Sequence, residues 1–490
     1  MQVGSQTAEI THRGHMSNSL PTQANLEHLK AQASDLLNAH RANDSSATQR
    51  LQAFFPEVTE FALHQAQLVI AREYGFDSWP AMKASLENSA LEQFVKAATD
   101  GRLEQADQWL IREPSLRNQP AVRLMLGEAI EDLTAPVPPL DRVPLLYIAF
   151  SKYASRAQNR AGLLALAQKC LDAGADANAY WQGDELEETA LYGSAGHNNF
   201  PELTKLLLDR GAEPTDPEAL YHSTEFADGE CLRLLLEGGG DPEGKNVLAR
   251  SLDFDHPICT ELVLRHGLKQ TDSVAIHHAI WRGRKLPTIR VLVEHGLDPG
   301  MVAPMFNVNA LDVAAMTGDF AILEWLEDQG HFLTVPSLEP VWRSLWDGDA
   351  VPGDYPEVMH LALFPAVAKG NARAIRAMVA SGFRIDTREP FNGGFPIHDA
   401  CFHGQPESLQ TLFDLGATWD VTDRQYNGHP LGWLLVGSQH TDRPADFLRC
   451  AEILVENGHS YKTAEREGAN AFWTGHPMIH DYFRSLGAIA

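Results

Sequence analysis

A histidine and a glutamate lie three residues apart in the segment ALYHSTEF, residues 219–226. If this segment is helical, His222 and Glu225 share one face, because residues three positions apart on a helix are neighbours. An imidazole next to a carboxylate can move protons as an acid–base pair. The two residues therefore define a candidate catalytic site for a hydrolase or a transferase.

The elements that must position these side chains are indicated by a recurring pattern, an apolar run that ends in glycine. A residue just past a helix often adopts the left-handed conformation, which glycine reaches without steric cost. Each such glycine therefore predicts the end of a helix. The pattern occurs at Gly174, Gly211, Gly239, Gly267, Gly296, Gly382 and Gly416.

A second, shorter apolar pattern precedes each of these runs, as in NALDVAAMTGD before WLEDQG. There, apolar residues recur at helical spacing on both sides of Gly318, which predicts two antiparallel helices joined by a tight turn. Small residues such as Ala314 and Ala400 would let neighbouring hairpins approach closely. The sequence thus predicts an all-α chain of repeated helical hairpins.

These repeats resemble the ankyrin family, whose repeat reads roughly T-P-L-H-x-A-A-x-x-G-H and then an apolar helix ending L-L-L-x-x-G-A-D. The segments that carry the resemblance are residues 188–212, 275–299 and 395–417, the last reading FPIHDACFHGQPESLQTLFDLGA. The resemblance extends from about Phe94 to the end of the chain and implies an ankyrin-repeat solenoid. It is closest to bacterial ankyrin proteins, because residues 67–87 resemble a helical module found ahead of such arrays.

The resemblance also implies roles for three positions of the first helix in each repeat. The position of the family's histidine, which makes hydrogen bonds between repeats, is occupied here by Tyr192, Tyr221, His277 and His398. The next position, and the one three residues later, would face the concave groove without a packing role. We predict that eight residues on this face bind a partner: His222, Glu225, Arg250, Asp253, His278, Trp281, Phe402 and Trp433. Asp399 and Met316 occupy equivalent positions. An ordinary solvated face is the alternative.

No cofactor or metal is expected. The sequence contains no G-x-S-x-G, P-loop, H-E-x-x-H or EF-hand pattern, and the glycines at 238–240 follow a helix and so form a cap. Packed helices lie about 8–10 Å apart, so His222 and His278, two repeats apart, would be separated by roughly 20 Å. A shared metal requires ligand bonds of about 2 Å, so these two histidines are not expected to bind the same metal ion.

Charge and cysteine content restrict the partners and the compartment. Lys and Arg number 39 against 65 Asp and Glu, which gives a net charge of -26. This charge repels phosphate backbones and anionic lipids, so we expect neither nucleic acid nor a membrane as a partner. The five cysteines include no C-x-x-C pair and there is no apolar signal or spanning segment, which favours the cytoplasm. The oligomeric state stays open.

Three regions are expected before and within the array. Residues 1–22 are polar and predict a disordered tail, and residues 23–88 predict a small helical bundle in which Ser78 caps a helix. The array then occupies 89–490, with residues 88–92 as a brief junction. A long insertion at 331–358 contains four prolines, so it is expected to be exposed, although Trp342 and Trp346 are spaced to form one amphipathic turn that docks.

The sequence favours a scaffold or adaptor that binds a protein, as repeat proteins do. The binding surface would be the concave groove together with the finger loops, which are the loops that project between successive helical hairpins. Two other functions remain open. One is the enzyme with a site around His222 and Glu225, and the other is an inhibitor or immunity protein that acts through its acidic surface.

Overall fold

The computed structural model describes residues 26–56, 61–76, 78–183, 186–267, 274–304, 306–439, 441–459 and 475–486. The predicted disordered tail, 1–22, lies outside these residues. The chain divides into two compact units. Unit 1 contains residues 1–223 and 233–240, and unit 2 contains residues 224–232 and 241–490.

The described part of unit 1 consists of helices and a small two-stranded hairpin. Its elements are α1 (Leu26–Arg41), α2 (Ser45–Phe54), α3 (Leu63–Glu73), α4 (Trp79–Thr99), α5 (Leu103–Arg112), η1 (Pro114–Asn118), α6 (Pro120–Leu126), α7 (Pro144–Ala149), η2 (Lys152–Ser155), α8 (Ala157–Asp172), β1 (Tyr180–Gln182), β2 (Glu187–Thr189), α9 (Ala190–Tyr192), η3 (Gly193–His197), α10 (Pro201–Asp209) and α11 (Pro217–Ser223). The strands β1 and β2 pair antiparallel, with Trp181 opposite Glu188. Residues of α12 (Glu230–Glu237) are divided between the units.

The first helices of unit 1 enclose a core of their own. Leu29, Leu51 and Val69 are fully buried in it, and Met82 joins it from the start of α4. Ser78 caps α4 as predicted, because its Oγ accepts a hydrogen bond from the Ala81 amide at 3.2 Å. The expected junction, 88–92, lies inside α4, a single helix of 21 residues.

Unit 2 is built of helical hairpins. Its elements are α13 (Val247–Asp253), α14 (Pro257–Arg265), α15 (Val274–Trp281), α16 (Leu286–Glu294), α17 (Ala310–Thr317), α18 (Phe320–Asp328), η4 (Pro336–Leu338), α19 (Glu339–Asp347), η5 (Glu357–Ala362), α20 (Leu363–Ala368), α21 (Ala372–Ala380), α22 (Pro396–Phe402), α23 (Pro406–Asp414), α24 (Pro430–Gly437), α25 (Pro444–Glu456) and α28 (Pro477–Ser485).

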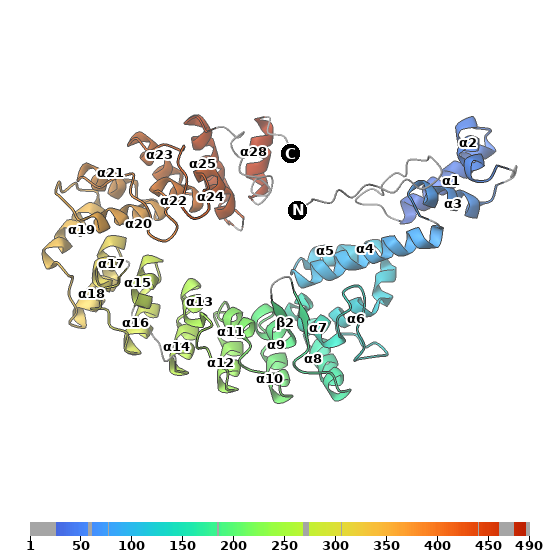
Figure 1. Cartoon of the computed structure of the whole chain (residues 1–490), viewed down its shortest axis with the longest axis horizontal. Coiled ribbons are helices and arrows are strands. Elements are labelled where there is room, and N and C mark those ends of the chain that lie inside the picture. Colours follow the sequence, from blue (N-terminus) through green and yellow to red (C-terminus); the bar gives the residue numbers. More distant parts are fainter. Residues whose placement is uncertain are drawn as a thin grey trace, which may run out of the picture. The chain divides into compact units, whose positions relative to one another are not determined.

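The hairpins of unit 2 stack so that first helices pack on first helices and second helices on second helices (Figure 1). Thus α15 contacts α17, α20 contacts α22 and α22 contacts α24, while α14 contacts α16 and α21 contacts both α19 and α23. One continuous apolar core runs between the two rows, from Leu252 to Phe483. The prediction of repeated helical hairpins is confirmed.

The glycines that were predicted to end helices all have positive φ, between 82° at Gly267 and 105° at Gly382. Gly318, the turn between α17 and α18, also has a positive φ of 70°. Here a second constraint applies, because an added Cβ would lie 2.5 Å from the Trp346 ring. Glycine at this position therefore permits both the turn and the close approach of α19.

The expectation that residues 331–358 are exposed is wrong for α19. Trp342 is 2% exposed and Leu345 is fully buried, and both belong to the core of unit 2. Pro340 does not interrupt the helix, because it lies in the first turn, where its missing amide hydrogen is not needed. The alternative, an amphipathic turn that docks through its tryptophans, is confirmed.

Candidate functional site

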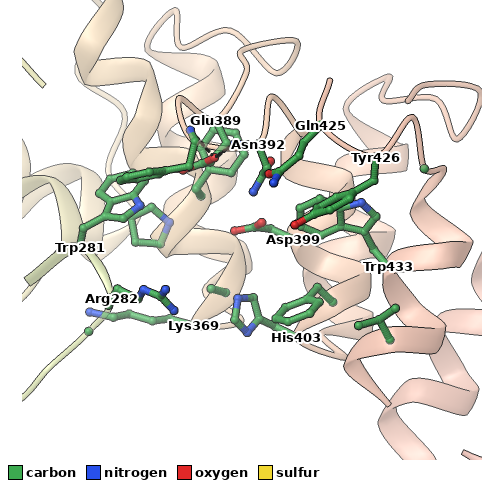
Figure 2. A pocket seen from close by; sticks show the side chains of 18 of the residues that line it. Trp281, Arg282, Lys369, Glu389, Asn392, Asp399, His403, Gln425, Tyr426 and Trp433 are labelled. Atoms are coloured by element: carbon green, nitrogen blue, oxygen red, sulfur yellow. Dashed lines mark hydrogen bonds between the residues drawn. The ribbon is translucent and has the colours of Figure 1, made fainter. Parts of the chain in front are cut away.

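The candidate site is a pocket of about 1660 Å³ in unit 2. It is lined by the first helices α15, α17, α20, α22 and α24 and by the loops that precede α22 and α24. In Figure 2, Asp399 lies in the middle of the pocket, with Trp281 on one side and Trp433 and Tyr426 on the other. The predicted residues His278, Trp281, Phe402 and Trp433 all line it, as does Asp399.

The two loops over the pocket are finger turns with the same construction. Each contains an aromatic residue followed by Asn-Gly, a strong signal for a tight hairpin turn: Phe391 to Gly393 and Tyr426 to Gly428. A buried acid closes each turn by accepting backbone amide hydrogens. Glu389 Oε2 accepts from Phe391 and Asn392, and Asp423 Oδ1 accepts from Tyr426 at 2.6 Å.

Adjacent fingers are also joined to each other. The Asn392 carbonyl accepts hydrogen bonds from the amides of Arg424 and Gln425, at 3.0 and 3.1 Å. The ring of Phe391 is 44% exposed and that of Tyr426 is 71% exposed. The fingers therefore hold two aromatic side chains at the pocket while keeping them accessible. The sequence analysis did not select these residues, although the repeated aromatic-Asn-Gly triplet was a visible signal.

Helix α22 fixes the position of Asp399 through its neighbour His398. The His398 ring is fully buried, with Nδ1 accepting from the Phe395 amide and Nε2 donating to the Gly428 carbonyl, both at 3.1 Å. Burial lowers the pKa of His398 to about 4. The predicted hydrogen-bonding role between repeats is thus observed at His398. The next side chain, Asp399, points into the pocket (Figure 2).

The carboxyl group of Asp399 has unusual surroundings. It forms no hydrogen bond or ion pair with any side chain that the structure describes, and it is half-buried among the pocket residues. Burial, together with the negative charge of Glu389, raises the pKa of Asp399 to about 8. Burial also raises the pKa of Glu389. A perturbed acid in a concave, partly apolar site is a feature of functional pockets.

The basic side chains of the pocket have internal partners. Lys369 Nζ donates to the Thr317 carbonyl at 2.7 Å and to Asp319 Oδ1 at 2.9 Å. Arg282 places Nη2 3.3 Å from Asp253 Oδ1 and donates from Nε to His278 Nε2 at 3.1 Å. Burial, followed by the charge of Arg282, lowers the pKa of His278.

Three other predicted residues form a chain of ion pairs that leads to the pocket. Glu225 accepts from Arg250 Nη2 at 2.6 Å, and Arg250 Nη1 lies 3.7 Å from Asp253 Oδ2. Asp253 then pairs with Arg282 of the pocket lining. A series of ion pairs therefore links Glu225, Arg250 and Asp253 to Arg282 at the pocket, although these three residues do not line it.

His222 lies at the end of α11 in unit 1. Its Nε2 is 3.4 Å from Glu218 Oε2, and its ring lies 5.3 Å from that of Tyr192. Glu225 belongs to unit 2, where Arg250 binds its carboxylate. The catalytic pairing of His222 with Glu225 stays a prediction.

The expectation that groove side chains have no packing role is wrong for both tryptophans. Trp281 packs against the core of unit 2, with its ring 5.2 Å from that of Phe306. Trp433 donates from Nε1 to Asp423 Oδ2 at 3.0 Å and contacts the ring of Phe402. In contrast, Phe402 is 38% exposed at the pocket. The tryptophans thus support the pocket walls as well as lining them.

Within the described ranges, no group of three or more histidine, cysteine or acidic side chains is placed to hold a metal ion. None of the described helices has the length and hydrophobicity needed to cross a membrane. All five cysteines are buried thiols without a disulfide.

A family model of ankyrin repeats matches one segment of the chain. Residues 276–327, which run from α15 to α18, match the family model of ankyrin repeats (many copies). A solved structure, the human ASB11 ankyrin repeat domain, is similar at 15% identity, with 63% of this chain and 98% of that chain covered and a TM-score of 0.22. No curated protein matches the chain.

The fold class is therefore an all-α solenoid that contains ankyrin repeats. Ankyrin repeats generally mediate contacts between proteins, and repeat solenoids do so with extended concave surfaces. The pocket lies on first helices and finger loops of the hairpins of unit 2, and two of these helices, α15 and α17, belong to the matched segment.

Proposed function

We propose that the chain is a scaffold or adaptor whose pocket in unit 2 binds a segment of a protein partner. The observation that carries the proposal is the size of the pocket together with the aromatic side chains that line it. About 1660 Å³ exceeds the roughly 300–1,000 Å³ of an ordinary small-molecule site and suits a segment of several residues. Its accessible aromatic rings, Phe391, Phe402 and Tyr426, belong to a residue class that contributes strongly to binding energy.

The cytoplasmic location and the similarity to bacterial proteins remain part of this proposal. Two further parts of the proposal rest on the acidic composition of the chain. They are the exclusion of nucleic acid as a partner and the alternative function, an inhibitor that blocks a basic partner. The division into an N-terminal module at 23–88 and an array at 89–490 is proposed on the separate core of α1, α2 and α3.

Affinity capture with the full chain tests the proposal when two matched variants are compared. Phe402→Ala removes an accessible ring from the pocket, whereas Phe332→Ala removes one that is 66% exposed elsewhere on unit 2. We expect Phe402→Ala to lose a partner that the unchanged chain and Phe332→Ala retain in stoichiometric amount. Equal retention by all three chains would contradict the proposal, provided that their melting temperatures agree.

A further inference from the structure

The pocket holds an acid, Asp399, whose ionised form is not stabilised by any side chain beside it in the described part of the chain. The Asp399 carboxyl group has no hydrogen bond or ion pair within the described part of the chain. The charged group that acts on it is another acid, Glu389, which makes its ionised form still less favourable. A buried carboxylate of this kind is stabilised when a cation binds beside it.

Two cations that line the pocket, Lys369 and Arg282, are paired with other acids. Lys369 is held by Asp319 and the Thr317 carbonyl, and Arg282 is held by Asp253. In Figure 2, Lys369 and Arg282 lie together on the Trp281 side of the pocket. Neither of these two side chains pairs with Asp399, so a cationic ligand that binds beside its carboxyl group would favour the ionised form.

Aromatic rings on both sides of Asp399 suit such a ligand. Figure 2 shows Trp281 on one side of the carboxyl group and Tyr426 and Trp433 on the other. Aromatic faces attract cations, and they stack well on the planar guanidinium of arginine, which also bonds a carboxylate in a bidentate manner. The net charge of -26 would draw a basic segment toward the molecule.

We infer that the pocket recognises a basic segment of a protein partner, with an arginine side chain inserted between the aromatic walls and bound to Asp399. This inference rests on the proposed function and specifies the chemistry of the partner. Arg284 also lines the pocket and would favour a negatively charged ligand, because its Nε is buried without an acceptor among the described residues. An acidic segment is therefore the competing outcome of the test.

The test uses a random library of linear heptapeptides displayed on phage, selected on the full chain. Enriched peptides are then synthesised with arginine and with citrulline, which has a similar shape but no charge. Their affinities are measured for the unchanged chain, for Asp399→Asn and for Asp386→Asn. Asp386 is an exposed acid of unit 2 that does not line the pocket, so it controls for general attraction to an acidic surface.

The inference predicts enrichment of arginine-containing peptides and a loss of affinity of about tenfold or more for citrulline, because a desolvated charge pair is lost. Asp399→Asn should cause a similar loss and should abolish the preference for arginine over citrulline. Asp386→Asn should leave both unchanged. Melting temperatures show whether each variant is folded.

Three outcomes would overturn the inference: enrichment of acidic peptides, arginine peptides that bind Asp399→Asn as well as the unchanged chain, or no enrichment. The proposed function is tested separately, by affinity capture of the partner with the Phe402→Ala and Asp399→Asn variants. Loss of the captured partner in Phe402→Ala but not in Asp399→Asn would keep the pocket as a partner site and reject arginine as its ligand. Retention in both would reject the pocket itself.

Discussion

His398 and Asp399 are consecutive residues of α22 with different surroundings. The imidazole of His398 is buried and hydrogen-bonded on both nitrogens, whereas the carboxyl group of Asp399 faces the pocket without a hydrogen-bonding partner among the described residues. Burial shifts the two pKa values in opposite directions, to about 4 for His398 and to about 8 for Asp399. In both cases burial favours the neutral form, which is the form that water stabilises less.

The depressed pKa of His398 predicts sensitivity to acid. Between about pH 6.5 and 4 the unfolded state binds a proton that the folded state does not, so stability falls as the pH falls through this range. The loss for this histidine approaches about 1.4 kcal/mol per pH unit. We expect His398→Gln to flatten the pH dependence of the unfolding free energy, measured by urea denaturation. An unchanged slope between pH 4 and 6.5 would contradict this assignment.

Asp399 predicts the opposite dependence. Its pKa is raised on folding, so between about pH 4 and 8 the folded state retains a proton that the unfolded state releases. The carboxyl group therefore destabilises the fold increasingly as the pH rises, up to about 8. We expect Asp399→Asn to melt at a higher temperature than the unchanged chain at pH 8 and at nearly the same temperature at pH 4. The exposed control Asp386→Asn should show no such divergence, and equal behaviour of the two variants would refute the prediction.

At the scale of elements, α19 is an additional helix in the row formed by the second helices of the hairpins. It contacts α21, and Arg343 pairs with Glu324 of α18 at 3.1 Å. On the other side, the Asn371 side chain donates to the Trp346 carbonyl at 3.2 Å. The helix thus fills the space between α18 and α21 and keeps the apolar core continuous across an irregular repeat.

This packing predicts that Trp342 is a major contributor to stability. Trp342→Ala would leave a large cavity and should lower the unfolding free energy by about 3–5 kcal/mol. Phe332→Ala, ten residues earlier and 66% exposed, should change it by about 0.5 kcal/mol or less. Chemical denaturation of both variants makes the comparison, and a small effect of Trp342→Ala would show that α19 is only loosely docked.

The elements were more accessible to sequence analysis than the site. Glycine at the end of an apolar run has one structural consequence, a positive φ, and all seven of the predicted positions show it. The packing of α19 was harder to predict, because proline counts against a helix except in its first turn. The pocket was only half predicted, since Phe402 and Trp433 follow from the helical register, whereas Phe391 and Tyr426 come from loops that a register does not describe.

At the scale of the whole molecule, α4 connects two different packing environments of unit 1. Its first half contributes Met82 to the N-terminal core, and its second half contains the buried residues Leu91, Phe94 and Val95. The predicted boundary near residue 89 therefore divides a continuous helix. The division of the chain at this point stays a prediction.

We expect a truncated chain that begins near residue 89 to fold, because it keeps the buried residues of the second half of α4 together with α5 and α6, which pack on this helix. Cooperative thermal unfolding, followed by circular dichroism, is the expected result. A broad, uncooperative transition would show that the first helices act as a cap that the repeats require, as the ends of repeat solenoids often do.

Photo-crosslinking from inside the pocket tests the central claim most directly. A photoreactive phenylalanine analogue at Phe402 lines the pocket, and the same analogue at Phe332 is exposed outside it. We predict that the Phe402 position captures one partner protein through a single short segment, while the Phe332 position does not capture it. Capture of the same proteins from both positions, or of none from Phe402, would contradict the account.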